Sequence, residues 1–209
     1  MSARLMEGLF SEGLETFRLL VMDGEFTVEL GAAIRAPGGV RRAVTALRNE
    51  FFPAPQSTIR SFGNLEVDYN QPLARLVEAG GYHYANPDIT AEHFPHQGGG
   101  KVVREAVLVG FGWRVKTSEV EAELRRLGID SADMAGLCAF GAKHPEVQGN
   151  NPVVAIGQHW VSSDIVYYGV LGGDGSSRVL FLSHSDKAGE WRESCLFLGF
   201  RDLSAPLAG

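Results

Sequence analysis

Residues 178–201 read RVLFLSHSDKAGEWRESCLFLGFR, and this stretch decides how the C-terminal part of the chain folds. Successive side chains of a β-strand point to opposite faces, so Leu180 and Leu182 share one face of a predicted strand. The other face carries Val179, Phe181 and Ser183. After a loop of mixed character, the apolar run 195–200 predicts a second strand that closes at Arg201.

Two interpretations fit this pattern. Apolar residues at regular positions alternate with residues of no common chemical type. A binding surface shows this pattern when the apolar scaffold residues are fixed and the exposed residues between them can vary. A terminal β-hairpin with a merely solvated outer face produces the same alternation. The pattern by itself leaves both interpretations open.

The composition limits the class of protein. With 209 residues, the chain is long enough for one large domain, or for one domain with a smaller companion, and for a sizeable core. Apolar residues make up 44% of the chain and charged residues 21%, which is ordinary for a globular protein. The formal net charge of −6 gives no electrostatic footprint for nucleic acid, which we exclude as a partner.

The sequence has no feature of a membrane or secreted protein. No run approaches the ~18 consecutive apolar residues that a membrane-spanning helix needs. The N-terminus carries Glu7, Glu12 and Glu15 and lacks the pattern of a signal peptide, so we expect a soluble, cytoplasmic protein. Cys138 and Cys195 are expected to be buried and reduced, although the sequence leaves a disulfide between them open.

The first part of the chain predicts an N-terminal α/β extension. Its expected elements are a helix over 2–14, a hairpin over 17–30 with its turn at Asp23-Gly24, and a helix over 40–51. Prolines at 53 and 55 end the second helix. We therefore divide the chain into an extension, 1–55, and a domain, 56–209.

Signals between residues 56 and 100 are weaker. Apolar residues at helical spacing predict a short helix near 73–77, which Gly80-Gly81 stops. A turn is expected at 86–88, and a short strand or extended piece over 89–94. The glycine-rich loop that follows marks either a domain boundary or a long loop inside one domain.

The second half of the chain gives sharper signals. An apolar strand is predicted over 105–115, and a capping box of Ser118 and Glu121 starts a helix. A second helix is capped by Asp130 or Ser131 and ends before a proline. Four strands are expected after it, at 152–160, 164–171, 178–184 and 195–200. This order predicts an α+β fold.

Four phrases carry a resemblance to a known family. They are PDITAEHFP (87–95), GAKHPEVQ (141–148), PVVAIG (152–157) and FLGFR (197–201), and they occur in that order. The chain thereby resembles a group of bacterial proteins with a C-type lectin fold, the variable proteins of diversity-generating retroelements. The resemblance implies a C-type lectin-like domain made of a strand, two helices and terminal antiparallel strands. Because the two ends of such domains meet, the strand near Val107 is expected to lie beside the strand near Leu198. Leu196 departs from the family, which usually has arginine there.

In that family the segment matching 178–195 differs from copy to copy, while the flanking phrases persist. The resemblance therefore implies a display protein whose surface binds a ligand, which we expect to be a protein. The implied ligand-binding positions are Val179, Phe181, Ser183, Ser185, Asp186, Lys187, Glu190, Arg192 and Ser194, with Tyr168 and Val170 on the preceding strand as secondary candidates. The implied scaffold positions, expected to be buried, are Leu180, Leu182, Trp191, Phe197 and Leu198.

Other chemistry has less support in the residues. His93 and His96 are the closest pair among six histidines, and single aspartates occupy the loops that would hold calcium, so we expect no metal and no cofactor. Neither cysteine lies in a nucleophile motif, and the segment GGGK (98–101) lacks the spacing of a phosphate loop. The remaining alternative is a small-molecule enzyme of unknown reaction, with a pocket between the N-terminal extension and the lectin-like domain.

Overall fold

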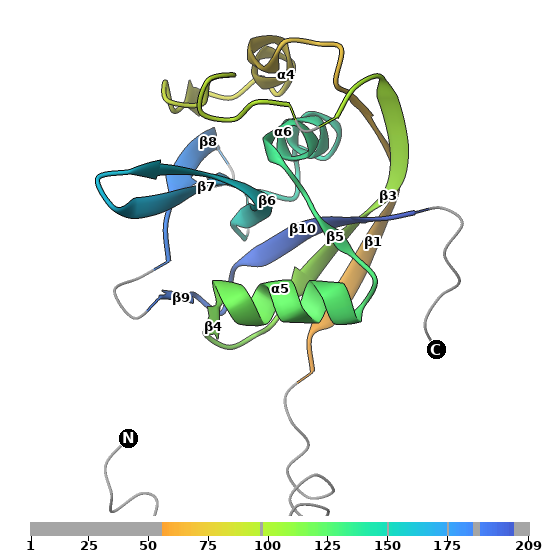
Figure 1. The fold of residues 1–209 in the computed structure, drawn as a ribbon, viewed down its shortest axis with the longest axis vertical. Helices are drawn as coiled ribbons and strands as arrows, with labels where there is room; N and C mark the ends of the chain where they lie inside the picture. The colour runs from red at the N-terminus through yellow and green to blue at the C-terminus, as the bar shows by residue number, and fades with distance from the viewer. Residues whose placement is uncertain (1–55, 97, 150, 175, 186–188, 203–209) are drawn as a thin grey trace, which may run out of the picture. The chain divides into compact units, whose positions relative to one another are not determined.

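The structure is a computed structural model (Figure 1), and it describes residues 56–96, 98–149, 151–174, 176–185 and 189–202. The chain separates into two compact units, Met1–Pro55 and Gln56–Gly209. The helices and the hairpin that the sequence predicts for the first unit lie outside the described residues. The following paragraphs therefore concern the second unit alone.

The described part of the chain is an α+β structure, mostly sheet, with three helices. The first elements are β1 (Thr58–Asp68), α4 (Leu73–Ala79), β2 (Tyr84–Ala85), β3 (Lys101–Gly110), β4 (Val115–Lys116), α5 (Thr117–Arg126) and β5 (Asp130–Ser131). The later ones are α6 (Met134–Lys143), β6 (Val153–Ser162), β7 (Ile165–Gly173), β8 (Arg178–Ser183), β9 (Glu190–Trp191) and β10 (Leu196–Arg201).

One large sheet organises these elements. Its strand order is β1-β3-β10-β6-β7-β8-β2, with β5 also paired to β10, and β4 and β9 form a separate two-stranded sheet. β3 and β10 are antiparallel neighbours, with Leu198 opposite Leu108 and Gly199 opposite Val107. The expectation that the strand near Val107 lies beside the last strand is confirmed.

The terminal segment does not form the β-hairpin that one interpretation of the sequence predicts. β8 lies between β7 and β2, whereas β10 lies between β3 and β6, so two strands separate them. After β8 the chain instead pairs β9 with β4, where Trp191 faces Val115. It then returns to the centre of the large sheet. The hairpin prediction is wrong because short-range patterning does not specify which strands become neighbours.

Both faces of the large sheet are covered (Figure 1). α4 and α6 lie on one face, and the buried residues between them and the sheet form what we call the α6-side core, which includes Leu73, Leu137 and Leu180. α5 lies on the other face, over an α5-side core that includes Leu124 and Phe197. The central strands therefore bury side chains in both directions.

The predicted alternation of β8 is confirmed. Leu180 is 0% exposed in the α6-side core, and Leu182 packs against the same core. Phe181 packs against the α5-side core on the opposite face. Leu182 is nevertheless half-buried, so the expectation that it is a fully buried scaffold residue is wrong. It lies near the end of β8, beyond the part of the strand that β2 covers.

The three helices lie where the sequence predicts them, but the residues that cap α5 and α6 differ from the predicted ones. α4 matches the predicted short helix, with Gly80 at its C-terminal end. α5 begins before the predicted capping box, because the Glu119 carboxylate accepts from the Lys116 N–H at 2.8 Å. α6 is capped by neither Asp130 nor Ser131. These residues form β5, and the Asp133 carboxylate accepts from the Gly136 N–H at 2.8 Å.

Two parts of the chain before β3 depart from the sequence analysis. β1 is a long strand that the sequence does not predict. It shows no clear apolar alternation, because most of its side chains are exposed. The predicted strand or extended piece at 89–94 is wrong: the Phe94 N–H donates to the Thr90 carbonyl at 2.8 Å, which closes a turn. The glycine-rich loop after it lies within one unit, because the Tyr69 N–H donates to the Gly100 carbonyl at 2.8 Å.

Leu180→Ala should lower the free energy of unfolding by about 2–5 kcal/mol, because it leaves a cavity in a closely packed core. Urea unfolding followed by circular dichroism measures this change. Val103→Ala is a suitable control, since Val103 is 44% exposed and its loss should cost no more than ~0.5 kcal/mol. Equal costs for the two variants would contradict the assignment of Leu180 to the core.

Candidate ligand-binding surface

The ligand-binding positions predicted on β7 and β8 share one face of the sheet. The register pairs Tyr168 with Ser183, and Gly172 with Val179. Phe181 faces Val170 between these pairs. This is the α5 side of the sheet, and the segment 189–194 continues from it toward β10. We use the name C-terminal face for the predicted ligand-binding positions that the structure describes, which are Tyr168, Val179, Phe181, Ser183, Ser185, Glu190, Arg192 and Ser194.

The exposure of these positions differs from the prediction. Arg192 and Ser194 are exposed, as predicted, whereas the following are only half-buried instead of substantially exposed: Tyr168, Val179, Phe181, Ser183, Ser185 and Glu190. Asp186 and Lys187 lie outside the described residues. Val170 is 2% exposed and belongs to the α5-side core, so it does not reach the surface as a secondary candidate should.

Phe181 is half-buried because a glycine on the neighbouring strand makes room for its ring. A Cβ atom added to Gly172 would lie 2.9 Å from Phe181 Cε1, closer than real side chains approach. The ring thus covers the Gly172 backbone and contacts the edge of the α5-side core. Phe181 is therefore partly exposed while it also contributes to the packing of the domain.

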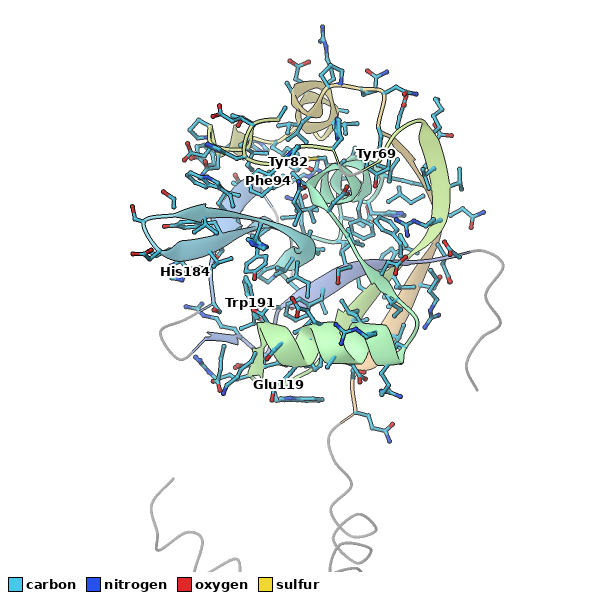
Figure 2. All side chains as sticks on the ribbon, in the orientation of Figure 1. Tyr69, Tyr82, Phe94, Glu119, His184 and Trp191 are labelled. Carbon is cyan, nitrogen blue, oxygen red and sulfur yellow. The ribbon has the colours of Figure 1, made fainter. Side chains whose placement is uncertain are left out.

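Trp191 anchors the segment that follows β8. Its side chain is 4% exposed, and its Nε1–H donates to the Thr117 hydroxyl at 2.9 Å. Figure 2 shows Trp191 beside the first turn of α5. The ring meets Tyr168 edge-on at 5.7 Å and Phe197 at 6.0 Å between centroids. The prediction that Trp191 is a buried scaffold residue is confirmed, as it is for Leu180, Phe197 and Leu198.

Tyr168 lies where the face meets α5. Burial raises the pKa of its hydroxyl, the Glu121 carboxylate raises the pKa further, and a hydrogen bond with Thr117 lowers it. The ring also lies 5.7 Å from the His159 ring on β6. At neutral pH Tyr168 is therefore a protonated phenol that can donate or accept one hydrogen bond at the rim of an apolar surface.

Sequence reasoning missed several residues at this surface. Trp113 is half-buried in the α5-side core, and its ring meets Phe111 edge-on at 5.3 Å. Arg114 lies 4.0 Å from the Glu190 carboxylate. Both precede β4, which pairs with β9, and only this pairing brings them near the C-terminal segment. The one signal in the sequence that could have marked the position is Gly112 next to Trp113, which interrupts the apolar run predicted as a strand over 105–115.

A second aromatic group lies on the opposite face of the same strands. The rings of His93 and Trp160 stack at 4.2 Å. Trp160 is 5.7 Å from Tyr167, which in turn is 5.8 Å from His184. These residues come from a loop, from β6, from β7 and from the end of β8. Sequence reasoning did not group them, because two of the four lie outside strands.

Neither cysteine shows the surroundings of a reactive thiol. Cys138 and Cys195 are both free and buried. Burial raises the pKa of the Cys138 thiol to about 12 and also raises the pKa of Cys195. Both thiols are thus protonated at neutral pH, which is the less nucleophilic form. Within the described ranges, no group of three His, Cys, Asp or Glu side chains is placed to hold a metal ion.

Comparisons of the chain with protein-family models, with curated proteins and with solved structures give no match. Among the helices of the described residues, none combines the length and hydropathy needed to cross a membrane.

Thr117→Val should destabilise the protein by about 1–3 kcal/mol, because the buried Trp191 Nε1–H loses its acceptor at nearly constant side-chain volume. Urea unfolding followed by circular dichroism measures the loss. Thr117→Ser keeps the hydroxyl and should recover most of the stability. If Thr117→Val and Thr117→Ser unfold alike, the hydrogen bond does not hold Trp191.

Proposed function

We propose that the protein binds a ligand, expected to be a protein, through the C-terminal face of a C-type lectin-like domain. The face is proposed to be diversified by a retroelement, so that related copies recognise different ligands. The proposal joins the resemblance in sequence to the arrangement of the described residues.

The topology supports the lectin-like part of the proposal. The first strand after the long loop, β3, pairs with the last strand, β10. α5 and α6 follow β3 in the chain, and β6, β7 and β8 come after them. The resemblance implies a strand, two helices and terminal antiparallel strands, with the first and last strands as neighbours. β6, β7 and β8 pair antiparallel in this way, whereas β10 pairs parallel with β6.

The observation that carries the proposal is the separation of scaffold and face along one segment. Leu180, Trp191, Phe197 and Leu198 are at most 4% exposed, so they hold the backbone of the segment in place. The intervening positions, such as Ser183 and Arg192, are half-buried or exposed. A backbone fixed by other residues can present different side chains without refolding, and such preorganisation lowers the entropic cost of binding.

The side chains of the face suit binding to a protein. Tyr, Trp and Arg are the residue types that most often contribute large shares of binding free energy, and Phe is also enriched at interfaces. Tyr168 and Phe181 are half-buried aromatic residues on one face of the sheet, and Arg192 is an exposed cation of the segment that follows. Single residues of this kind contribute about 2 kcal/mol or more when a partner buries them.

A matched pair of libraries tests the proposal. One library randomises Val179, Phe181, Ser183 and Arg192, and the other randomises Leu180, Trp191, Phe197 and Leu198. Surface display with protease challenge measures the folded fraction of each. We expect the face library to contain ~10-fold more folded clones, since surface changes usually shift stability by only ~0.5 kcal/mol. Selection of the face library on lysozyme, as a protein probe, should then yield binding clones.

Two results would count against the proposal. Equal folded fractions in the two libraries would make the face ordinary structure. A well-folded face library without binders to lysozyme, or to a second unrelated protein, would remove the display function.

The DNA beside the coding sequence tests the retroelement separately. It should encode a reverse transcriptase and hold a near-copy of the segment for residues 178–195 that differs from it at adenines only. Flanking DNA without either feature would exclude diversification by this route.

A further inference from the structure

Arg178, the first residue of β8, joins two helices to the strand that carries the C-terminal face. Its Nη1 donates to the Gly80 carbonyl at 2.6 Å, and its Nη2 donates to the Gly141 carbonyl at 2.5 Å. Gly80 is the C-terminal cap of α4, and Gly141 lies in the last turn of α6. One guanidinium therefore ties β8 to the ends of both helices.

Both acceptors are carbonyls that a helix leaves without an internal partner. The last four carbonyls of an α-helix have no N–H to bind, and they carry the negative end of the helix dipole. The guanidinium is the only side-chain cation with a rigid fork that reaches two such acceptors at once. Arg178 is thus held in place through Nη1 and Nη2 by main-chain oxygens of two separate elements, while its buried Nε has no hydrogen-bond partner among the described residues.

The Tyr82 ring packs against one face of the Arg178 guanidinium. The ring lies 5.1 Å from Arg178 Cζ, in the geometry of a cation–π contact. A Cβ atom added to Gly80 or to Gly141 would overlap the Tyr82 side chain. The same two glycines that offer their carbonyls to Arg178 therefore also admit the ring that supports it. Figure 2 shows Tyr82 near α6.

Two further contacts extend from this cluster into the strands. Gln148, which is 1% exposed, accepts from Arg178 Nη2 at 3.3 Å and donates to the Gly172 carbonyl of β7 at 2.7 Å. The His83 N–H donates to the Arg178 carbonyl at 2.9 Å, and the Arg178 N–H donates to His83 Nδ1 at 3.1 Å. Gly172 is opposite Val179, the first position of the face.

We propose that Arg178 is the positioning residue of the C-terminal face, fixing the register and tilt of β8 so that its ligand-facing side chains can be exchanged while the strand stays in place. The anchor follows from the geometry, whereas its role in binding rests on the proposed function. Arg178 is therefore a position within the segment 178–195 that diversification must leave unchanged.

Arg178→Lys tests the inference, because lysine keeps the charge and loses the fork. We expect hydrogen exchange of the amides at 179–183 to accelerate by ~10-fold or more, while exchange at β3 and β10 stays within about twofold. Arg125→Lys, at an exposed position of α5, is the control and should change neither region. In a face-library clone selected on lysozyme, Arg178→Lys should weaken the dissociation constant by ~10-fold at equal folded concentration.

Gly141→Ala provides a second variant that leaves Arg178 itself unchanged. Alanine has a higher helix propensity than glycine, so any loss here reports the displacement of the side chains that its Cβ would meet. These are Tyr82, whose hydroxyl would lie closest, and Leu171 of β7, whose methyl groups would lie 3.0 Å away. We expect the same local acceleration of exchange over 179–183. If Arg178→Lys does not fold, this variant and the exchange of the unmodified protein decide the question.

The outcomes separate the inference from the proposed function. In the unmodified protein, amides of β8 should exchange as slowly as those of β10, and fast exchange there would overturn the anchor. Unchanged exchange in both variants, or a uniform acceleration over the whole domain, would overturn it as well. An unchanged dissociation constant in Arg178→Lys would remove the positioning role. A face library that gives no binders counts against the proposed function only, because the exchange measurements still decide the anchor.

Discussion

The pairing of β3 with β10 is the contact on which the rest of the described domain depends. These two strands are far apart in sequence and both lie inside the sheet, with the whole of α5 and α6 between them in the chain. Leu108 and Leu198 point into the α6-side core, while Val107 and Phe197 point into the α5-side core. Both layers of helix pack on this pair of strands, because it supplies an apolar surface on each face.

Side chains become more exposed along the sheet from β10 toward β8. β6 begins with buried residues on both faces, whereas β7 begins with the exposed Ile165 and Val166, and β8 holds one buried residue, Leu180, among half-buried ones. Tyr168 and Phe181 lie at this margin, where the α5-side core gives way to solvent. Trp191 holds the segment after β8 against the first turn of α5, because its Nε1–H donates to the Thr117 hydroxyl. The C-terminal face is the region where the core ends while the backbone is still fixed.

The two faces of β8 have different physical roles. Arg178 and Leu180 connect the strand to helix ends and to a dry core, and the cost of disturbing them is the loss of charge-assisted hydrogen bonds and of close packing. Val179 and Ser183 make no comparable contact, so their replacement has little to disrupt. A strand with fixed side chains on one face and replaceable side chains on the other can keep its backbone conformation while the residues on the second face change.

The sequence by itself determined the α+β class, the short helix before Gly80, the two consecutive helices and the alternation of Leu180 and Phe181. These follow from local periodicity and breaker residues, which act over a few positions. Tertiary structure alone decided that β10 lies between β3 and β6, that Asp133 caps α6, and that Phe181 rests on Gly172. It also decided that Arg178 meets Gly80 and Gly141. These contacts join residues from different elements, and no local pattern encodes which elements pack together, because that choice depends on how the whole chain buries its apolar surface.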